Sequence, residues 1–143
     1  MFLSTFSPAN AGRRAVHAYA ETRVNGAQAT EHPGHALIEM LFEGAQESIA
    51  RARGLLAAGD IAGKGEAITR ALAIVGEGLR GSLNMARGGA LAHELDALYS
   101  YLETRLTHAN LHNSDAALEE CSRLLRPVQD AWTQIGRQVK GEH

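Results

Sequence analysis

The stretch "SLNMARGGALAHELDALYSYLETRLTHAN", residues 82–110, decides the fold class of this chain. Its leucines recur at steps of three and four, which places their side chains on one face of an α-helix: Leu91, Leu95, Leu98, Leu102 and Leu106. Gly88 and Gly89 precede this run, and two glycines permit a tight reversal of the chain. The stretch therefore predicts a helix that follows a preceding helix through a turn near Gly88-Gly89 and ends in "NLHNSD".

The segment before this stretch predicts two more helices. Apolar residues at helical spacing from His35 to Ala58 indicate one buried face, made of Ile38, Leu41, Ala45, Ile49, Ala52 and Leu56. Gly59 favours the end of that helix, and the Asp60 carboxylate can cap the next one. The core face of this second helix is predicted to contain Ile61, Ile68, Leu72, Val75, Leu79 and Leu83.

A fourth helix is predicted to begin near Asp115. Its apolar positions keep a three-four alternation to the end of the chain: Leu118, Cys121, Leu125, Val128, Trp132, Ile135 and Val139. Pro127 removes one amide from its interior, but the alternation continues past it. The pattern predicts a kink at Pro127 rather than a break.

The N-terminal region is less regular. Residues 9–24 offer few apolar anchors and lead into the turn-rich loop "NGAQATEHPG". We expect residues 1–34 to form a mobile N-terminal arm and linker, with an additional short helix at most. The predicted architecture is all-α: an antiparallel four-helix bundle over residues 35–140, preceded by this arm.

Composition excludes several classes of function. The chain has 143 residues, is 45% hydrophobic and carries a formal charge of −2, so it offers no broad basic surface for nucleic acid. Cys121 is the one cysteine, which rules out an intramolecular disulfide and favours a reducing compartment. No apolar run has the length of a membrane-spanning helix, and the first residues lack the order of a secretory signal. We predict a cytoplasmic protein with no membrane insertion.

A search for catalytic or metal chemistry finds little. No Glu is followed three residues later by His, the pattern that holds metal ions in helical bundles. His108 and His112 share a helix face without a further ligand nearby, and His93 is flanked by acids rather than by cations that would stabilise a phosphoryl group. Cys121 falls in phase with the core. The sequence predicts no enzyme, no cofactor and no metal site.

The second predicted helix carries a further stripe of small and flexible residues beside its core face. Its members follow helical spacing: Ala67, Ala71, Ile74, Gly78 and Met85. Small residues allow close approach of another backbone, and Met repacks readily, so the stripe is a candidate groove for a guest helix. The alternative is an apolar face widened for two neighbouring helices of the bundle. Tyr99 and Tyr101 admit the same two interpretations, and Trp132 favours the core.

The motifs "LIEMLFEGA" (37–45) and "SLNM..GG.LA..L..LY.YL..RL..AN" (82–110), followed by Trp132, resemble the FliS family of flagellin export chaperones. The resemblance implies a small cytoplasmic helical bundle that holds the disordered C-terminal segment of flagellin and delivers it to the flagellar export apparatus. It further implies that Tyr19 belongs to an arm lying over the client groove, and that Asn84 and Asn110 are polar positions of the motif, which either touch the client or cap helices.

These observations lead to one hypothesis and one alternative. The hypothesis is a non-enzymatic chaperone that binds the flagellin C-terminal segment in apolar grooves and prevents premature polymerisation. The candidate partner-binding residues are Tyr19, Ala67, Ala71, Ile74, Gly78, Asn84, Met85, Tyr99 and Asn110. The alternative is a generic helical adaptor for another amphipathic helix.

Overall fold

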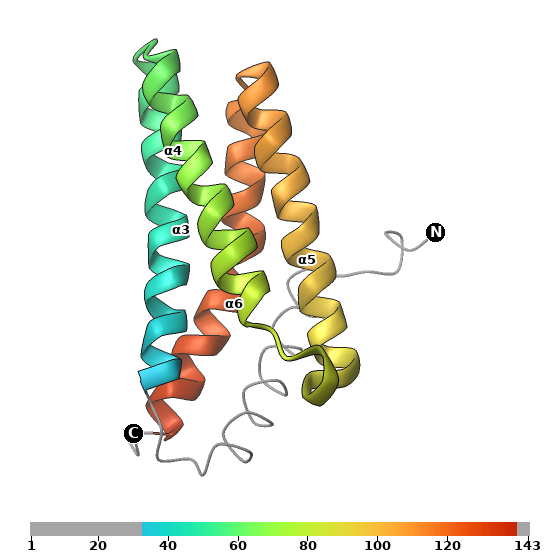
Figure 1. The fold of residues 1–143 in the computed structure, drawn as a ribbon. Coiled ribbons are helices and arrows are strands. Elements are labelled where there is room, and N and C mark those ends of the chain that lie inside the picture. Colours follow the sequence, from blue (N-terminus) through green and yellow to red (C-terminus); the bar gives the residue numbers. More distant parts are fainter. Residues whose placement is uncertain (1–32, 140–143) are drawn as a thin grey trace.

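The computed structural model describes residues 33–139, and this part of the chain is helical throughout, with no strand. The elements are α3 (Pro33–Ala57), α4 (Ile61–Ala73), the π-helix η1 (Ile74–Leu79), the 3₁₀-helix η2 (Arg80–Ser82), α5 (Met85–His112) and α6 (Asp115–Val139). Successive long helices run in opposite directions, and α6 returns to lie beside α3 (Figure 1). The predicted all-α bundle is confirmed. Residues 1–32, with Tyr19 and most of the predicted arm, lie outside the described residues.

The turn between α3 and α4 follows the predicted capping chemistry. Gly59 adopts a left-handed φ of 82°, and its amide and that of Asp60 donate back to the carbonyls of Leu56 and Leu55 at 3.0 and 2.9 Å. The Asp60 carboxylate then accepts from the Gly63 amide at 2.9 Å. Carbonyls at the end of one helix and an amide at the start of the next are thus satisfied within a short turn, which sets the two helices antiparallel.

The second predicted helix ends differently from the expectation. Regular α-helix stops at Ala73, and the chain continues as a π-helix and then a 3₁₀ turn before it becomes extended at Leu83. The reversal occurs at Leu83-Asn84, because the Asn84 side chain caps the new helix by accepting from the Arg87 amide at 3.0 Å. Gly88-Gly89 lies inside α5, where Gly89 (φ 56°, ψ −135°) produces a kink. The second helix was thus predicted to end too late, because it stops at Ser82, whereas Gly89 does break the helical path, between a first turn of α5 and its long part.

The second hairpin joins α5 to α6. Asn113 takes a left-handed φ of 51°, and the Ser114 hydroxyl accepts from the Ala117 amide at 3.1 Å. Helix α6 continues across Pro127, as predicted, and Figure 1 shows its later half turning towards the start of α3. There the Trp132 indole donates to the His35 carbonyl at 3.0 Å and stacks on the His35 ring at 4.4 Å.

A single apolar core runs the length of the bundle. Most predicted core positions are buried, including Ile38, Cys121 and Trp132. The prediction missed Phe42, which is 1% exposed, and placed Leu41 in the core although it is only half-buried. The core face of α3 is therefore centred closer to Phe42 than the sequence pattern indicated. Full burial of a side chain such as Phe42 contributes about 1.5–3 kcal/mol to stability.

Candidate functional site

An apolar stripe on α3 faces away from the core. Leu37 and Met40 are 57% and 64% exposed, and Leu41 is half-buried beside them. Together with Gly44 they follow steps of three, one and three, which places all four on one side of the helix. Exposed apolar side chains are ordinary when scattered, but a stripe of them marks a surface for an apolar partner.

The stripe borders the π-helix η1. A Cβ atom at Gly44 would lie 3.2 Å from Cδ1 of Ile74, and one at Gly78 would lie 3.0 Å from Cδ2 of Leu41. These distances show that the glycines bring the two helices close together. We call the surface made by Leu37, Met40, Leu41, Gly44, Ile74 and Gly78 the α3–η1 seam.

The π-helix that forms one side of the seam is held from behind by α5. Arg80, the first residue of η2 directly after the π-helix, donates to Asp96 at 2.6 Å and to Glu103 at 2.9 Å. Glu103 also lies against Gly76, where any side chain would collide with its carboxylate. Hydrogen bonds to the two carboxylates raise the pKa of Arg80 above its usual value. Short π-helical insertions are frequent at functional sites, and charged contacts of Arg80 hold the C-terminal end of this one against α5.

The structure divides the stripe predicted on the second helix. Ala67 and Ala71 lie in the core, 6% and 0% exposed, and show a partner almost no surface. Ile74 and Gly78 are half-buried and belong to the α3–η1 seam. Met85 is 37% exposed in the first turn of α5. Core packing therefore accounts for the α4 part of the stripe, and the partly exposed positions in η1 and α5 stay candidates for partner binding.

The remaining predicted site residues make structural contacts. Tyr99 is 3% exposed and lies in the core, whereas Tyr101 is 36% exposed and donates to Glu120 at 2.6 Å. Asn84 caps α5. Asn110 accepts from the Lys64 ammonium group through its backbone oxygen at 2.9 Å and its side-chain oxygen at 2.8 Å. The structure thus brings Ile74 and Gly78 together at one surface and places Tyr99 inside the bundle.

Sequence reasoning missed three residues of interest. Leu37 and Met40 carry much of the exposed apolar surface of α3, and the signal was present in "LIEMLFEGA". Five of the six residues from 37 to 42 are apolar, more than one helix face can bury. Lys64, only 3% exposed, ties α4 to the last turn of α5, and a lysine at that position gave no sequence signal for burial.

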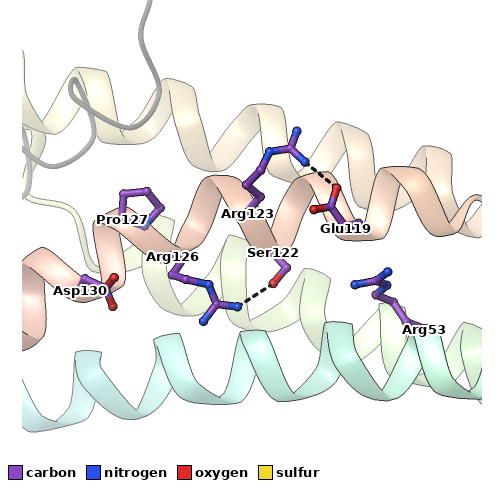
Figure 2. Close-up of a pocket in the computed structure, with 7 residues that line it drawn as sticks. All are labelled: Arg53, Glu119, Ser122, Arg123, Arg126, Pro127 and Asp130. Atoms are coloured by element: carbon purple, nitrogen blue, oxygen red, sulfur yellow. Dashed lines mark hydrogen bonds and ion pairs between the residues drawn. The ribbon is translucent and has the colours of Figure 1, made fainter.

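A second concavity lies on the opposite side of α3, between α3 and α6 (Figure 2). Its volume is about 420 Å³, and it is lined by Arg53, Glu119, Ser122, Arg123, Arg126, Pro127 and Asp130. We call it the α3–α6 groove. Because its lining is mainly charged, it differs in chemistry from the α3–η1 seam.

Reactive groups in the described part of the chain are few. Burial raises the pKa of the Cys121 thiol to about 12, so the nucleophilic thiolate is scarce at neutral pH. Residues 33–139 contain no cluster of three His, Cys, Asp or Glu side chains that could hold a metal ion. His93 bonds the Gly89 carbonyl at 2.8 Å, and His108 packs against His112. None of the helices described here is long and apolar enough to cross a membrane.

Fold and seam together define the class of protein: a small antiparallel helical bundle with an apolar surface seam between its first two long helices. The family described as "Flagellar protein FliS" matches residues 13–139, and the chain belongs to this family.

Curated relatives agree with this membership. The chain is 43% identical over 120 residues to the flagellar secretion chaperone FliS of Salmonella typhimurium (strain LT2), covering 84% of this chain and 88% of that protein. It is 42% identical over 109 residues to the flagellar secretion chaperone FliSB of Pseudomonas aeruginosa, covering 76% and 86%. The Escherichia coli K12 relative, also named flagellar secretion chaperone FliS, is 36% identical over 119 residues, covering 83% and 87%. The resemblance inferred from the sequence motifs is confirmed.

Proposed function

We propose that this protein is a flagellar secretion chaperone without catalytic activity, which binds the C-terminal segment of flagellin in the cytoplasm and delivers it to the flagellar export apparatus. The names of the curated relatives support the chaperone role. The observation that carries the binding step is the exposed stripe of Leu37 and Met40 along the α3–η1 seam. An amphipathic client helix presents apolar side chains at the same spacing and would bury this stripe.

The seam suits a client that must be held and later released. Leu and Met side chains without polar partners impose no fixed hydrogen-bond pattern, and Met adapts to different contact surfaces. The glycines at positions 44 and 78 let Ile74 and Leu41 of the opposite helix pack closely across the seam, which leaves Leu37 and Met40 as its most exposed apolar side chains. Ile74, Gly78 and Met85 are the previously predicted residues that we propose contact the client, while Ala67, Ala71 and Tyr99 would support the helices from inside.

Titration calorimetry of the full chain with the C-terminal segment of flagellin from the same genome tests this function. We expect saturable binding at micromolar concentration with a negative heat-capacity change, because apolar surface is buried. An unrelated amphipathic helix of equal length and charge serves as a comparison. Equal binding of that helix would support a generic helical adaptor, and no binding of the flagellin segment would contradict the proposal.

The location of the site is tested with matched leucine variants. Leu37→Ser and Leu111→Ser each remove one exposed leucine, 57% and 74% exposed, but Leu111 lies in the last turn of α5, outside the seam. Loss of one well-buried apolar contact should weaken client binding about tenfold or more in Leu37→Ser. Leu111→Ser should bind as the unaltered protein does. Equal weakening of client binding by the two variants would show that the client does not bind at the seam.

A further inference from the structure

The π-helix η1 has one glycine against each of two neighbouring helices. A side chain at Gly78 would meet the end of Leu41 of α3, and a side chain at Gly76 would meet the carboxylate of Glu103 of α5. Because η1 lies against α5 on one side and against α3 on another, its contact with α5 also affects the surface that it presents to α3. The α5 side of η1 therefore bears on the geometry of the α3–η1 seam.

The backbone at the end of η1 satisfies two hydrogen-bond patterns at once. The Arg80 amide donates to the carbonyls of both Val75 and Gly76. The bond to Val75 spans five residues and is the π-helical pattern, whereas the bond to Gly76 spans four and is the α-helical pattern. Long-lived π-helices are rare, and interior glycines disfavour any helix. We infer that contacts with the rest of the bundle, rather than local propensity, select the π-helical pattern.

Glu103 contacts both ends of this last turn. Its Oε1 accepts from the Arg80 guanidinium at 2.9 Å, and its Oε2 lies where a methyl group at position 76 would be. Asp96 accepts from the same guanidinium at 2.6 Å, but it does not come within 4 Å of a Cβ atom built at Gly76. Of the two carboxylates that bind Arg80, Glu103 is thus the one that also rests on the π-helix.

We propose that Glu103 is a positioning residue for the α3–η1 seam, because its carboxylate holds residues 74–79 in the π-helical pattern from the α5 side. A π-helical bond encloses one residue more than an α-helical bond, and one residue corresponds to about 100° of rotation around an α-helix. Loss of the π-helical pattern would therefore rotate Gly78 relative to α4 and away from Leu41. The effect on client binding rests on the function proposed above, whereas the effect on the hydrogen-bond pattern does not.

Nuclear magnetic resonance of the full chain without client tests the hydrogen-bond pattern. The side chains of Glu103 and Asp96 are 31% and 32% exposed and bond the same arginine, so Glu103→Ala and Asp96→Ala are matched variants. Scalar couplings across hydrogen bonds identify the carbonyls that accept from the Arg80 amide. We expect coupling to Val75 in the unaltered protein and in Asp96→Ala, but coupling to Gly76 alone in Glu103→Ala. Coupling to Val75 that persists in Glu103→Ala, or that both variants lose, would overturn the proposal.

Client binding tests whether this pattern positions the seam. In calorimetry with the C-terminal segment of flagellin, Glu103→Ala should weaken binding about fivefold, the equivalent of one hydrogen bond. Asp96→Ala should bind as the unaltered protein does. Unchanged affinity in a Glu103→Ala protein that has lost the coupling to Val75 would overturn the positioning role.

A double variant separates this role from a general loss of stability. Gly76→Ala should weaken client binding as Glu103→Ala does, because the added methyl group displaces the carboxylate. The two substitutions together should weaken binding no more than either alone, since both remove the same contact. Additive weakening would overturn the proposal. If the unaltered protein does not bind the flagellin segment, the proposed function is contradicted, and the coupling to Val75 alone decides the role of Glu103.

Discussion

The two sides of helix α3 make different kinds of contact. On the side facing η1, Leu37 and Met40 remain exposed, and glycines bring the neighbouring helix close. On the side facing α6, Gln46 and Arg53 make paired, directional hydrogen bonds to Ser122 and Asp115. Directional polar contacts connect α3 to α6, and on the other side Arg70 of α4 bonds Glu47 and Ser48 next to the apolar stripe. The contrast shows that a helix packed on both sides can still expose apolar side chains along one of them.

The largest expected effect separates core from surface on α3 itself. Phe42→Ala removes a side chain that is 1% exposed, and the loss of burial plus the cavity should lower the free energy of unfolding by about 3–5 kcal/mol. Met40→Ser, two residues away and 64% exposed, should change it by less than about 0.5 kcal/mol. Urea unfolding of both variants and of the unaltered protein measures these changes in the free energy of unfolding. A large loss of stability in Met40→Ser would mean that the exposed stripe is part of the packed core.

The stripe predicted on the second helix offers the next test. Ala71→Gln places a polar side chain where Ala71 is 0% exposed, and overpacking should cost about 1–3 kcal/mol of unfolding free energy or more.

Gly78→Gln is the matched variant at the seam. Its side chain would meet the flexible end of Leu41, 3.0 Å from the position of a Cβ atom. We expect a smaller stability change and weaker binding of the flagellin segment, both measured on the same samples. If Ala71→Gln leaves stability unchanged, then α4 has space beside it that the structure does not show.

The smallest expected effect concerns the anchored side of α3 and depends on pH. The hydrogen bond from Arg53 holds the pKa of Asp115 below its usual value. Because the folded-state pKa lies below the unfolded value of about 3.9, this pair stabilises the fold above that pH and stops doing so as the pH falls through the folded pKa.

The variant Arg53→Gln should therefore lower the unfolding free energy near neutral pH by less than about 1 kcal/mol, since the pair is solvent-exposed and screened by salt. The difference from the unaltered protein should disappear in acid. Chemical unfolding of both proteins at a series of acidic pH values measures this difference in unfolding free energy. A difference that stays constant with pH would show that Arg53 acts through packing rather than through its charge.

Much of the fold could be predicted from local patterns. The C-terminal end of α3 follows from the backbone freedom of Gly59, and the start of α4 follows from the capping carboxylate of Asp60. Both effects act over a few residues. Helix α6 keeps its apolar alternation through Pro127 and is continuous. The end of the second helix was harder, because Gly88-Gly89 and Asn84 both offer turn chemistry within five residues. Which of them makes the reversal depends on how the next helix packs.

The sequence by itself determined the helical class, the turn between α3 and α4, the burial of Cys121 and Trp132, and the family motifs, because each of these depends on periodicity or on short-range backbone chemistry. Tertiary structure alone decided which apolar residues stay outside. Leu41, Met40 and Phe42 are similar in hydrophobicity, yet only Phe42 is fully buried. The π-helix, the glycine contacts across the seam and the position of Arg126 beside α3 also depend on residues distant in the chain. Side-chain burial and helix spacing are properties of packed neighbours, and a pattern read along one helix does not specify where those neighbours lie.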